Sequence, residues 1–147
     1  MNGFNKRCCG GVGFYLNDPH FEIKVSISEK DETNLHQEVV ESFLKKIKRT
    51  YNLERCYRVE FLKDVRSHIG LGSETQIKYA LAQAVLKLEA IDDSVCEFAH
   101  KLHLSGVSGI GYGAFAEGGF VMDLGYIFGK DKQNFVEHSL RPPTMPW

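Results

Sequence analysis

Two glycine-rich segments carry the residue types that bind phosphate groups. The first, "HIGLGSETQ" at residues 68–76, stands directly before a long run of apolar residues at helical spacing. A helix N-terminus presents unpaired N–H groups and a partial positive charge, and glycines let an anion approach the backbone closely. The segment therefore predicts a phosphate site formed by Gly70, Leu71, Gly72, Ser73 and Thr75. The alternative is that Ser73 is an ordinary helix cap and no ligand binds.

The second segment is "SGVSGIGYGAFAEGGF", residues 105–120. It is too rich in alanine and aromatic residues for a disordered linker, and we interpret it as a glycine loop that leads into a strand at residues 118–129. Neither segment matches the nucleotide P-loop pattern, and the first also fails the Rossmann pattern because position 75 is threonine.

The elements that must position these loops follow from hydrophobic periodicity. Alternation predicts strands at residues 10–16 and 21–28, joined as a hairpin by "NDPH", and a third strand at 56–64. In the second strand Phe21, Ile23, Val25 and Ile27 form the buried face. Helical spacing predicts helices at 34–50, after the first glycine loop, and at about 91–102. The predicted order is β-β-α-β-α-α-β, an α/β protein of the α+β type with a mixed sheet, helices on one face, and a single domain over residues 1–147.

Composition narrows the classes of partner and the compartment. The formal net charge is -1, from 18 basic and 19 acidic residues, which argues against nucleic-acid binding. No apolar run reaches the length needed to span a bilayer, and the first residues lack the apolar core of a signal peptide. The four cysteines show no C-x-x-C spacing, so we expect free thiols and a cytoplasmic location.

The two segments together resemble a known family. "HIGLGSETQ", then "SGIG" at residues 108–111, then "AFAEGGFVMD" at 114–123 are similar to motifs of the beta-ribofuranosylaminobenzene 5'-phosphate synthases. That family belongs to the superfamily of galactokinase, homoserine kinase, mevalonate kinase and phosphomevalonate kinase. The resemblance covers most of the chain and implies the fold of that superfamily's N-terminal domain.

The resemblance implies a reaction and its participants. A para-substituted benzoate would be condensed with phosphoribosyl pyrophosphate, with loss of carbon dioxide and pyrophosphate, in methanopterin-type cofactor biosynthesis, chiefly in archaea. It implies Mg²⁺ at the pyrophosphate and adds Ser108, Gly109 and Gly111 to the phosphate-binding set. Either Glu117 or Asp123 would hold the metal or stabilise the cationic sugar, or else these are a solvated turn residue and a strand-end residue.

The chain also departs from the family pattern. Glu74 stands where the family usually has a third glycine, and no arginine precedes Ser108. The family's polypeptides are about twice as long, so the first strand and the C-terminal domain are expected to be absent, and the exposed sheet edge is compatible with a homodimer. These departures keep two alternatives open: a non-catalytic phosphate-ligand-binding paralogue, and a small-molecule kinase. Superfamily kinases usually carry S-G-x-D, and Gly111 in place of that aspartate disfavours the kinase.

Overall fold

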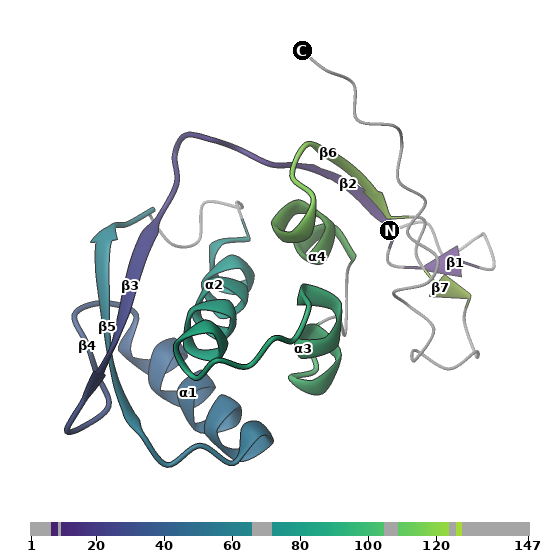
Figure 1. Ribbon diagram of the computed structural model, residues 1–147. Coiled ribbons are helices and arrows are strands. Elements are labelled where there is room, and N and C mark those ends of the chain that lie inside the picture. Colours follow the sequence, from purple (N-terminus) through teal and green to yellow (C-terminus); the bar gives the residue numbers. More distant parts are fainter. Residues whose placement is uncertain (1–6, 9, 66–71, 105–108, 124–125, 128–147) are drawn as a thin grey trace. The chain divides into compact units, whose positions relative to one another are not determined.

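The protein is an α+β fold in which four helices and several short strands are described (Figure 1). This computed structural model describes residues 7–8, 10–65, 72–104, 109–123 and 126–127. The strands are β1 (Arg7–Cys8), β2 (Gly11–Phe14), β3 (Glu22–Ser28), β4 (Glu32–Thr33), β5 (Cys56–Lys63), β6 (Phe120–Asp123) and β7 (Tyr126–Ile127). The helices are α1 (Gln37–Tyr51), α2 (Ser73–Leu88), α3 (Val95–Lys101) and α4 (Gly109–Ala116). The chain divides into two compact units, one at Asn17–Leu102 and one combining residues 1–16 and 103–147.

A mixed three-stranded sheet forms one side of the Asn17–Leu102 unit. β5 is central, antiparallel to β3 and parallel to β4. As the alternation predicted, Tyr57, Val59 and Phe61 of β5 are all buried, whereas Arg58 and Glu60 carry ion pairs to Glu32 and Lys24. One face of the sheet is therefore apolar and covered, and the other is charged.

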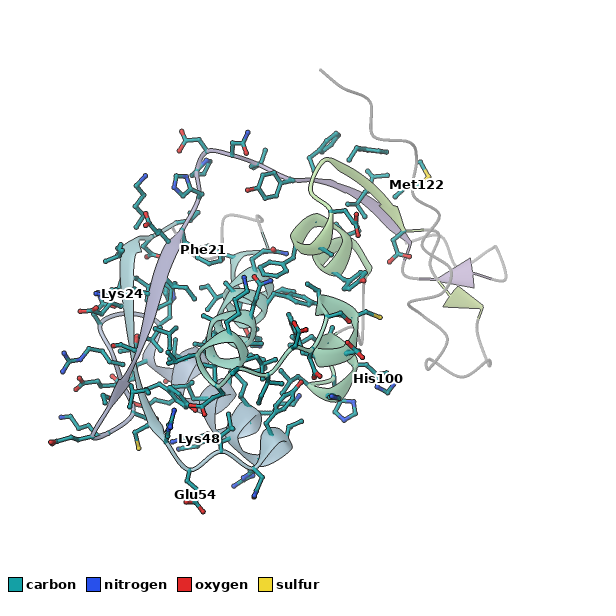
Figure 2. All side chains as sticks on the ribbon, viewed as in Figure 1. Phe21, Lys24, Lys48, Glu54, His100 and Met122 are labelled. Atoms are coloured by element: carbon teal, nitrogen blue, oxygen red, sulfur yellow. The ribbon has the colours of Figure 1, made fainter. Side chains whose placement is uncertain are left out.

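The helices α1 and α2 cover the apolar face of this sheet (Figure 1). The helical spacing predicted helices on one face of the sheet. Of the predicted apolar stripes, Leu35 and Leu88 are exposed, whereas the following residues are buried: Val40, Phe43, Leu44 and Ile47 of α1, and Ile77, Leu81 and Val85 of α2. Lys48 ties α1 to the sheet, because its Nζ lies 2.6 Å from Oδ2 of Asp31 and the other carboxylate oxygen accepts the backbone N–H of Tyr57 (Figure 2).

The second unit contains a two-stranded antiparallel ribbon with α4 against one face. β2 pairs with β6, with Gly11 opposite Asp123 and Phe14 opposite Phe120. Val121 and Asp123 are buried on the side of α4. Phe14, Phe120, Val12 and Met122 are exposed on the other side, and Figure 2 shows Met122. The rings of Phe14 and Phe120 lie 5.0 Å apart, centroid to centroid.

Three predictions from the sequence are wrong. β2 and β3 do not form a hairpin, because β2 pairs with β6 and β3 with β5. Ile27 does not lie on a buried face, since its exposed fraction is 53%. Residues 109–116 are not a loop but the helix α4, which is followed by the predicted strand. The short strands β1 and β4 were not predicted either, and β7 lies within the single strand predicted at residues 118–129.

Two negative predictions can be compared with the described part of the chain. None of its helices is both long and apolar enough to cross a membrane. Cys56 and Cys96 are free thiols, as expected from the cysteine spacing.

Candidate functional site

The start of α2 is built around a left-handed glycine. Gly72 is the N-cap residue, with φ 64° and ψ 24°, and its carbonyl oxygen accepts the N–H groups of Thr75 and Gln76. Ser73 is the first helical residue, so the alternative in which Ser73 caps the helix is wrong. Because Gly72 has no side chain, it makes no side-chain cap hydrogen bond to the helix. Gly72, Ser73 and Thr75 thus lie together at the helix start, while Gly70 and Leu71 fall outside the described residues.

The acidic residue that departs from the family pattern has a cationic partner. Glu74 lies in the first turn of α2, and its Oε1 is 2.5 Å from Nζ of Lys78. A carboxylate here competes with a bound anion for the positive end of the helix. Lys78 offsets part of that negative charge. The sequence analysis did not single out Lys78, although the four-residue spacing is the signal that would have found it.

The start of α4 differs from that of α2, because a carboxylate of the protein accepts a backbone N–H group of its first turn. The backbone N–H of Gly109 donates to Oδ2 of Asp123 over 2.7 Å, and both residues are buried. Gly111 lies two residues further into the helix, and Ser108 falls outside the described residues. The structure therefore brings two predicted site residues, Gly109 and Asp123, into direct contact.

Glu117 lies at the other end of α4. Its backbone N–H donates to the carbonyl of Gly113, and it is exposed. An eight-residue helix is about 12 Å long, so the helix separates Glu117 from Asp123. The two carboxylates do not form one cluster. Among the described residues no group of three His, Cys, Asp or Glu side chains is placed to hold a metal ion.

The glycines of the second unit have a packing role. A Cβ on Gly13 would lie 2.2 Å from Cγ2 of Ile110, and one on Gly11 would lie 3.0 Å from Cδ1 of the same residue. A Cβ on Gly113 would lie 2.7 Å from Cγ1 of Val121. The missing side chains let α4 approach the ribbon closely. At Gly72, by contrast, an added Cβ would meet nothing within 4 Å, and only its positive φ favours glycine there.

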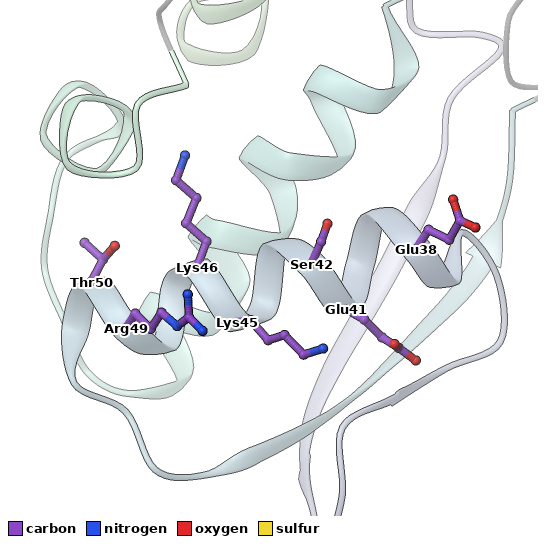
Figure 3. A pocket seen from close by; sticks show the side chains of 7 residues that line it. All are labelled: Glu38, Glu41, Ser42, Lys45, Lys46, Arg49 and Thr50. Carbon is purple, nitrogen blue, oxygen red and sulfur yellow. The ribbon is translucent and has the colours of Figure 1, made fainter.

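A concave surface elsewhere does not qualify as a site. It is lined by Glu38, Glu41, Ser42, Lys45, Lys46, Arg49 and Thr50, which all belong to α1 (Figure 3). One helix cannot enclose a ligand, so we interpret this surface as the solvated face of α1.

Comparison with known proteins finds relatives of one name. The chain is 35% identical over 142 residues to a beta-ribofuranosylphenol 5'-phosphate synthase of Archaeoglobus fulgidus, covering 95% of this chain and 44% of that protein. It is 31% identical to the proteins of that name from Methanothermobacter thermautotrophicus and Methanocaldococcus jannaschii, in each case over 99% of this chain and 47% and 49% of those proteins, respectively. No family model matches the chain. The chain spans slightly less than half the length of the curated relatives it matches.

Proposed function

We propose that this chain forms part of an enzyme that condenses a para-substituted benzoate with phosphoribosyl pyrophosphate. The three relatives named beta-ribofuranosylphenol 5'-phosphate synthase support the predicted relationship to this synthase family. A bond forms between C1 of the ribose and the ring carbon that bears the carboxylate. Carbon dioxide leaves from that carbon, and its bonding electron pair restores the aromatic ring. Pyrophosphate leaves from C1. The relatives' name specifies a phenol, which points to 4-hydroxybenzoate as the aromatic acid.

The start of α2 is the observation that carries this proposal. Gly72 turns the backbone into the left-handed region and, having no side chain, makes no side-chain cap hydrogen bond at the start of the helix that follows. Backbone N–H groups at such a terminus suit a phosphate or pyrophosphate group. Ser73 and Thr75 add hydroxyl donors in the first turn. This geometry supports binding of the anionic sugar substrate, while the chemistry comes from the family relationship.

Mg²⁺ would enter such a site with the substrate rather than reside in the protein. It is usually bound by one or two carboxylates together with substrate phosphates. Among the described residues no group of three His, Cys, Asp or Glu side chains is placed to hold a metal ion, which is compatible with that mode. When bound, the ion would offset the charge of the departing pyrophosphate.

Other parts of the proposal concern the whole protein. The mixed sheet with α1 and α2 on one face is compatible with the N-terminal domain of the galactokinase and homoserine kinase superfamily. The free thiols Cys56 and Cys96 are compatible with a cytoplasmic location. A homodimer through an open sheet edge stays a prediction.

A binding experiment with two matched variants tests the α2 site. The chain is titrated calorimetrically with phosphoribosyl pyrophosphate and Mg²⁺, and separately with ATP and Mg²⁺. Asp and Asn both tolerate a positive φ better than other residues, so Gly72→Asp and Gly72→Asn should both fold. Gly72→Asp places a carboxylate at the helix start and should weaken binding of the phosphoribosyl ligand at least tenfold, whereas the neutral Gly72→Asn should weaken it much less.

The outcomes separate the candidate functions. Equal loss in both variants, or no binding by the folded wild-type chain, would overturn the α2 site. Binding of ATP alone would favour a kinase. Glu74 favours the second candidate, a phosphate-ligand-binding paralogue without turnover, because it places a carboxylate in the first turn. If the ligand binds, release of carbon dioxide from carboxyl-labelled 4-hydroxybenzoate distinguishes the synthase from that paralogue.

A further inference from the structure

Asp123 is the one polar or charged residue in the buried class among the described residues, with an exposed fraction of 8%. It is the last residue of β6, and alternation along that strand puts it on the same side as the buried Val121. A buried carboxylate costs several kcal/mol unless hydrogen bonds or opposite charge compensate it. Its position therefore calls for a compensating group nearby.

That group is the first turn of α4. The N–H of Gly109 donates to the Asp123 carboxylate over 2.7 Å inside the unit. A charge-assisted hydrogen bond and the positive end of the helix dipole both stabilise a carboxylate at this place. Gly11 is opposite Asp123 in the ribbon register, so no side chain of β2 competes for the space at that pair.

The rest of α4 is held on the ribbon by close packing. Ile110 fills the space above Gly11 and Gly13, and Gly113 lies against Val121. These contacts restrict sliding and rotation of the helix on the ribbon. The bond from Asp123 adds a polar anchor at the end of α4 where the family motif begins.

We infer that Asp123 is a positioning residue, not a catalytic one. Its carboxylate acts through Gly109 to fix the first turn of α4. Because the carboxylate already occupies that helix start, a ligand phosphate binds elsewhere. The inference deepens the proposed function and rests on it only where ligand binding is concerned. It replaces the sequence-based roles of Asp123 as a metal-binding or sugar-stabilising carboxylate and of Gly109 as a phosphate-binding residue.

The hydrogen bond is tested by NMR on the whole chain. The Gly109 amide proton should resonate downfield in the wild type and move upfield on acidification, as the Asp123 carboxyl group takes up a proton. Asp123→Asn retains an acceptor oxygen, so the amide should stay hydrogen-bonded while its pH dependence disappears. A Gly109 resonance that ignores the titration of the Asp123 carboxyl carbon would overturn the inference.

The positioning role is tested by ligand affinity in the same variants. Asp123→Asn should bind phosphoribosyl pyrophosphate with Mg²⁺ within about threefold of the wild type, because the anchor is retained. Asp123→Ala leaves the buried N–H unpaired and should weaken binding roughly tenfold. Glu54→Gln, which removes an exposed carboxylate just before β5, serves as the control for loss of a negative charge.

The opposite pattern identifies a direct role. If Asp123→Asn loses Mg²⁺-dependent binding as completely as Asp123→Ala while its Gly109 amide stays hydrogen-bonded, Asp123 contacts the metal or the ligand and the inference is wrong. If the wild type binds no phosphoribosyl pyrophosphate, the proposed function fails. The NMR titration still decides the assignment of the Asp123–Gly109 pair in that case. Should Asp123→Ala fail to fold, the Asp123→Asn variant carries both measurements alone.

Discussion

The starts of α2 and α4 look alike in the sequence and are built differently. Each helix follows or begins with glycines in a segment that matches a family motif. At α2, the N-cap residue Gly72 adopts a left-handed conformation and makes no side-chain cap hydrogen bond. At α4, Gly109 is buried and its N–H is bound by Asp123.

The difference shows two uses of glycine. Gly72 has open space around its Cα, and what it supplies is a backbone angle. Gly11, Gly13 and Gly113 instead supply the absence of a side chain, which allows two elements to approach each other. At α4 a carboxylate of the protein already accepts the first N–H, whereas Gly72 provides no side-chain cap at α2.

The largest loss of stability is expected at Gly13, where an added side chain would overlap a neighbouring residue. Gly13→Ala would place a Cβ 2.2 Å from Ile110, and we expect a loss of about 3 kcal/mol in stability. Gly72→Ala, the matched control, meets no atom and should lose about 1 kcal/mol from its positive φ. Urea denaturation followed by circular dichroism, with amide exchange of β6 as a local probe, measures both. Equal losses of stability in the two variants would contradict the distinction between a glycine that allows close packing and one that supplies a backbone angle.

The next effect concerns side-chain caps. α3 has the cap that α2 lacks: the Ser94 hydroxyl accepts the N–H of Glu97, and the Glu97 carboxylate accepts the N–H of Ser94 over 2.8 Å. Ser94→Ala should cost about 1 kcal/mol of unfolding free energy. Ser73→Ala should change it by less than about 0.5 kcal/mol, since Ser73 is not a cap. A comparable loss at Ser73 would mean that its hydroxyl does cap α2.

A smaller effect is expected from the charge beside Gly72. Glu74→Gln removes a carboxylate from the first turn of α2 and should tighten binding of phosphoribosyl pyrophosphate about threefold. Lys78→Gln should weaken it by a similar factor, because Glu74 then loses its partner. Calorimetric titration at low salt measures both. If neither changes the affinity, the ligand does not contact this helix start.

The smallest effect is an acid dependence at α3. Hydrogen bonds from the Ser94 hydroxyl and backbone N–H lower the pKa of the Glu97 carboxyl below its ordinary value. A group with a lowered pKa in the folded state stabilises the fold above its unfolded pKa, and this contribution disappears as the pH falls through the folded pKa. The melting temperature should therefore fall less on acidification in Ser94→Ala than in the wild type. An unchanged pH dependence would contradict this assignment.

The sequence predicted the elements whose partners are near in the chain or whose periodicity is strong. β5, α1 and α2 have one apolar face each, and these faces form the core of their unit. The start of α2 was predicted only to follow the first glycine loop, and the helix begins at Ser73. The capping box of α3 also has a signal in the sequence, a serine followed three residues later by a glutamate.

The remaining features depend on distant contacts. Strand-like alternation in residues 11–14 is equally compatible with pairing to β3 and with pairing to β6, and the nearer partner was chosen wrongly. α4 contains three glycines in eight residues, which disfavours a helix by roughly 1 kcal/mol each. Its packing on the ribbon overrides that tendency. The bond between Asp123 and Gly109 has no local signal, because it joins a side chain to a backbone group across the fold.

The order of the elements along the chain has a consequence during protein synthesis. β2 is made before the whole Asn17–Leu102 unit, and its partner β6 is made after it. The Asn17–Leu102 unit contains all of its own strand pairings and can fold while the ribosome is still working. Until β6 emerges, Val12 and Phe14 lie on a strand with no partner. Throughout that interval the apolar side chains of β2 are exposed to aggregation, and slowing synthesis between residues 102 and 123 would prolong that exposure.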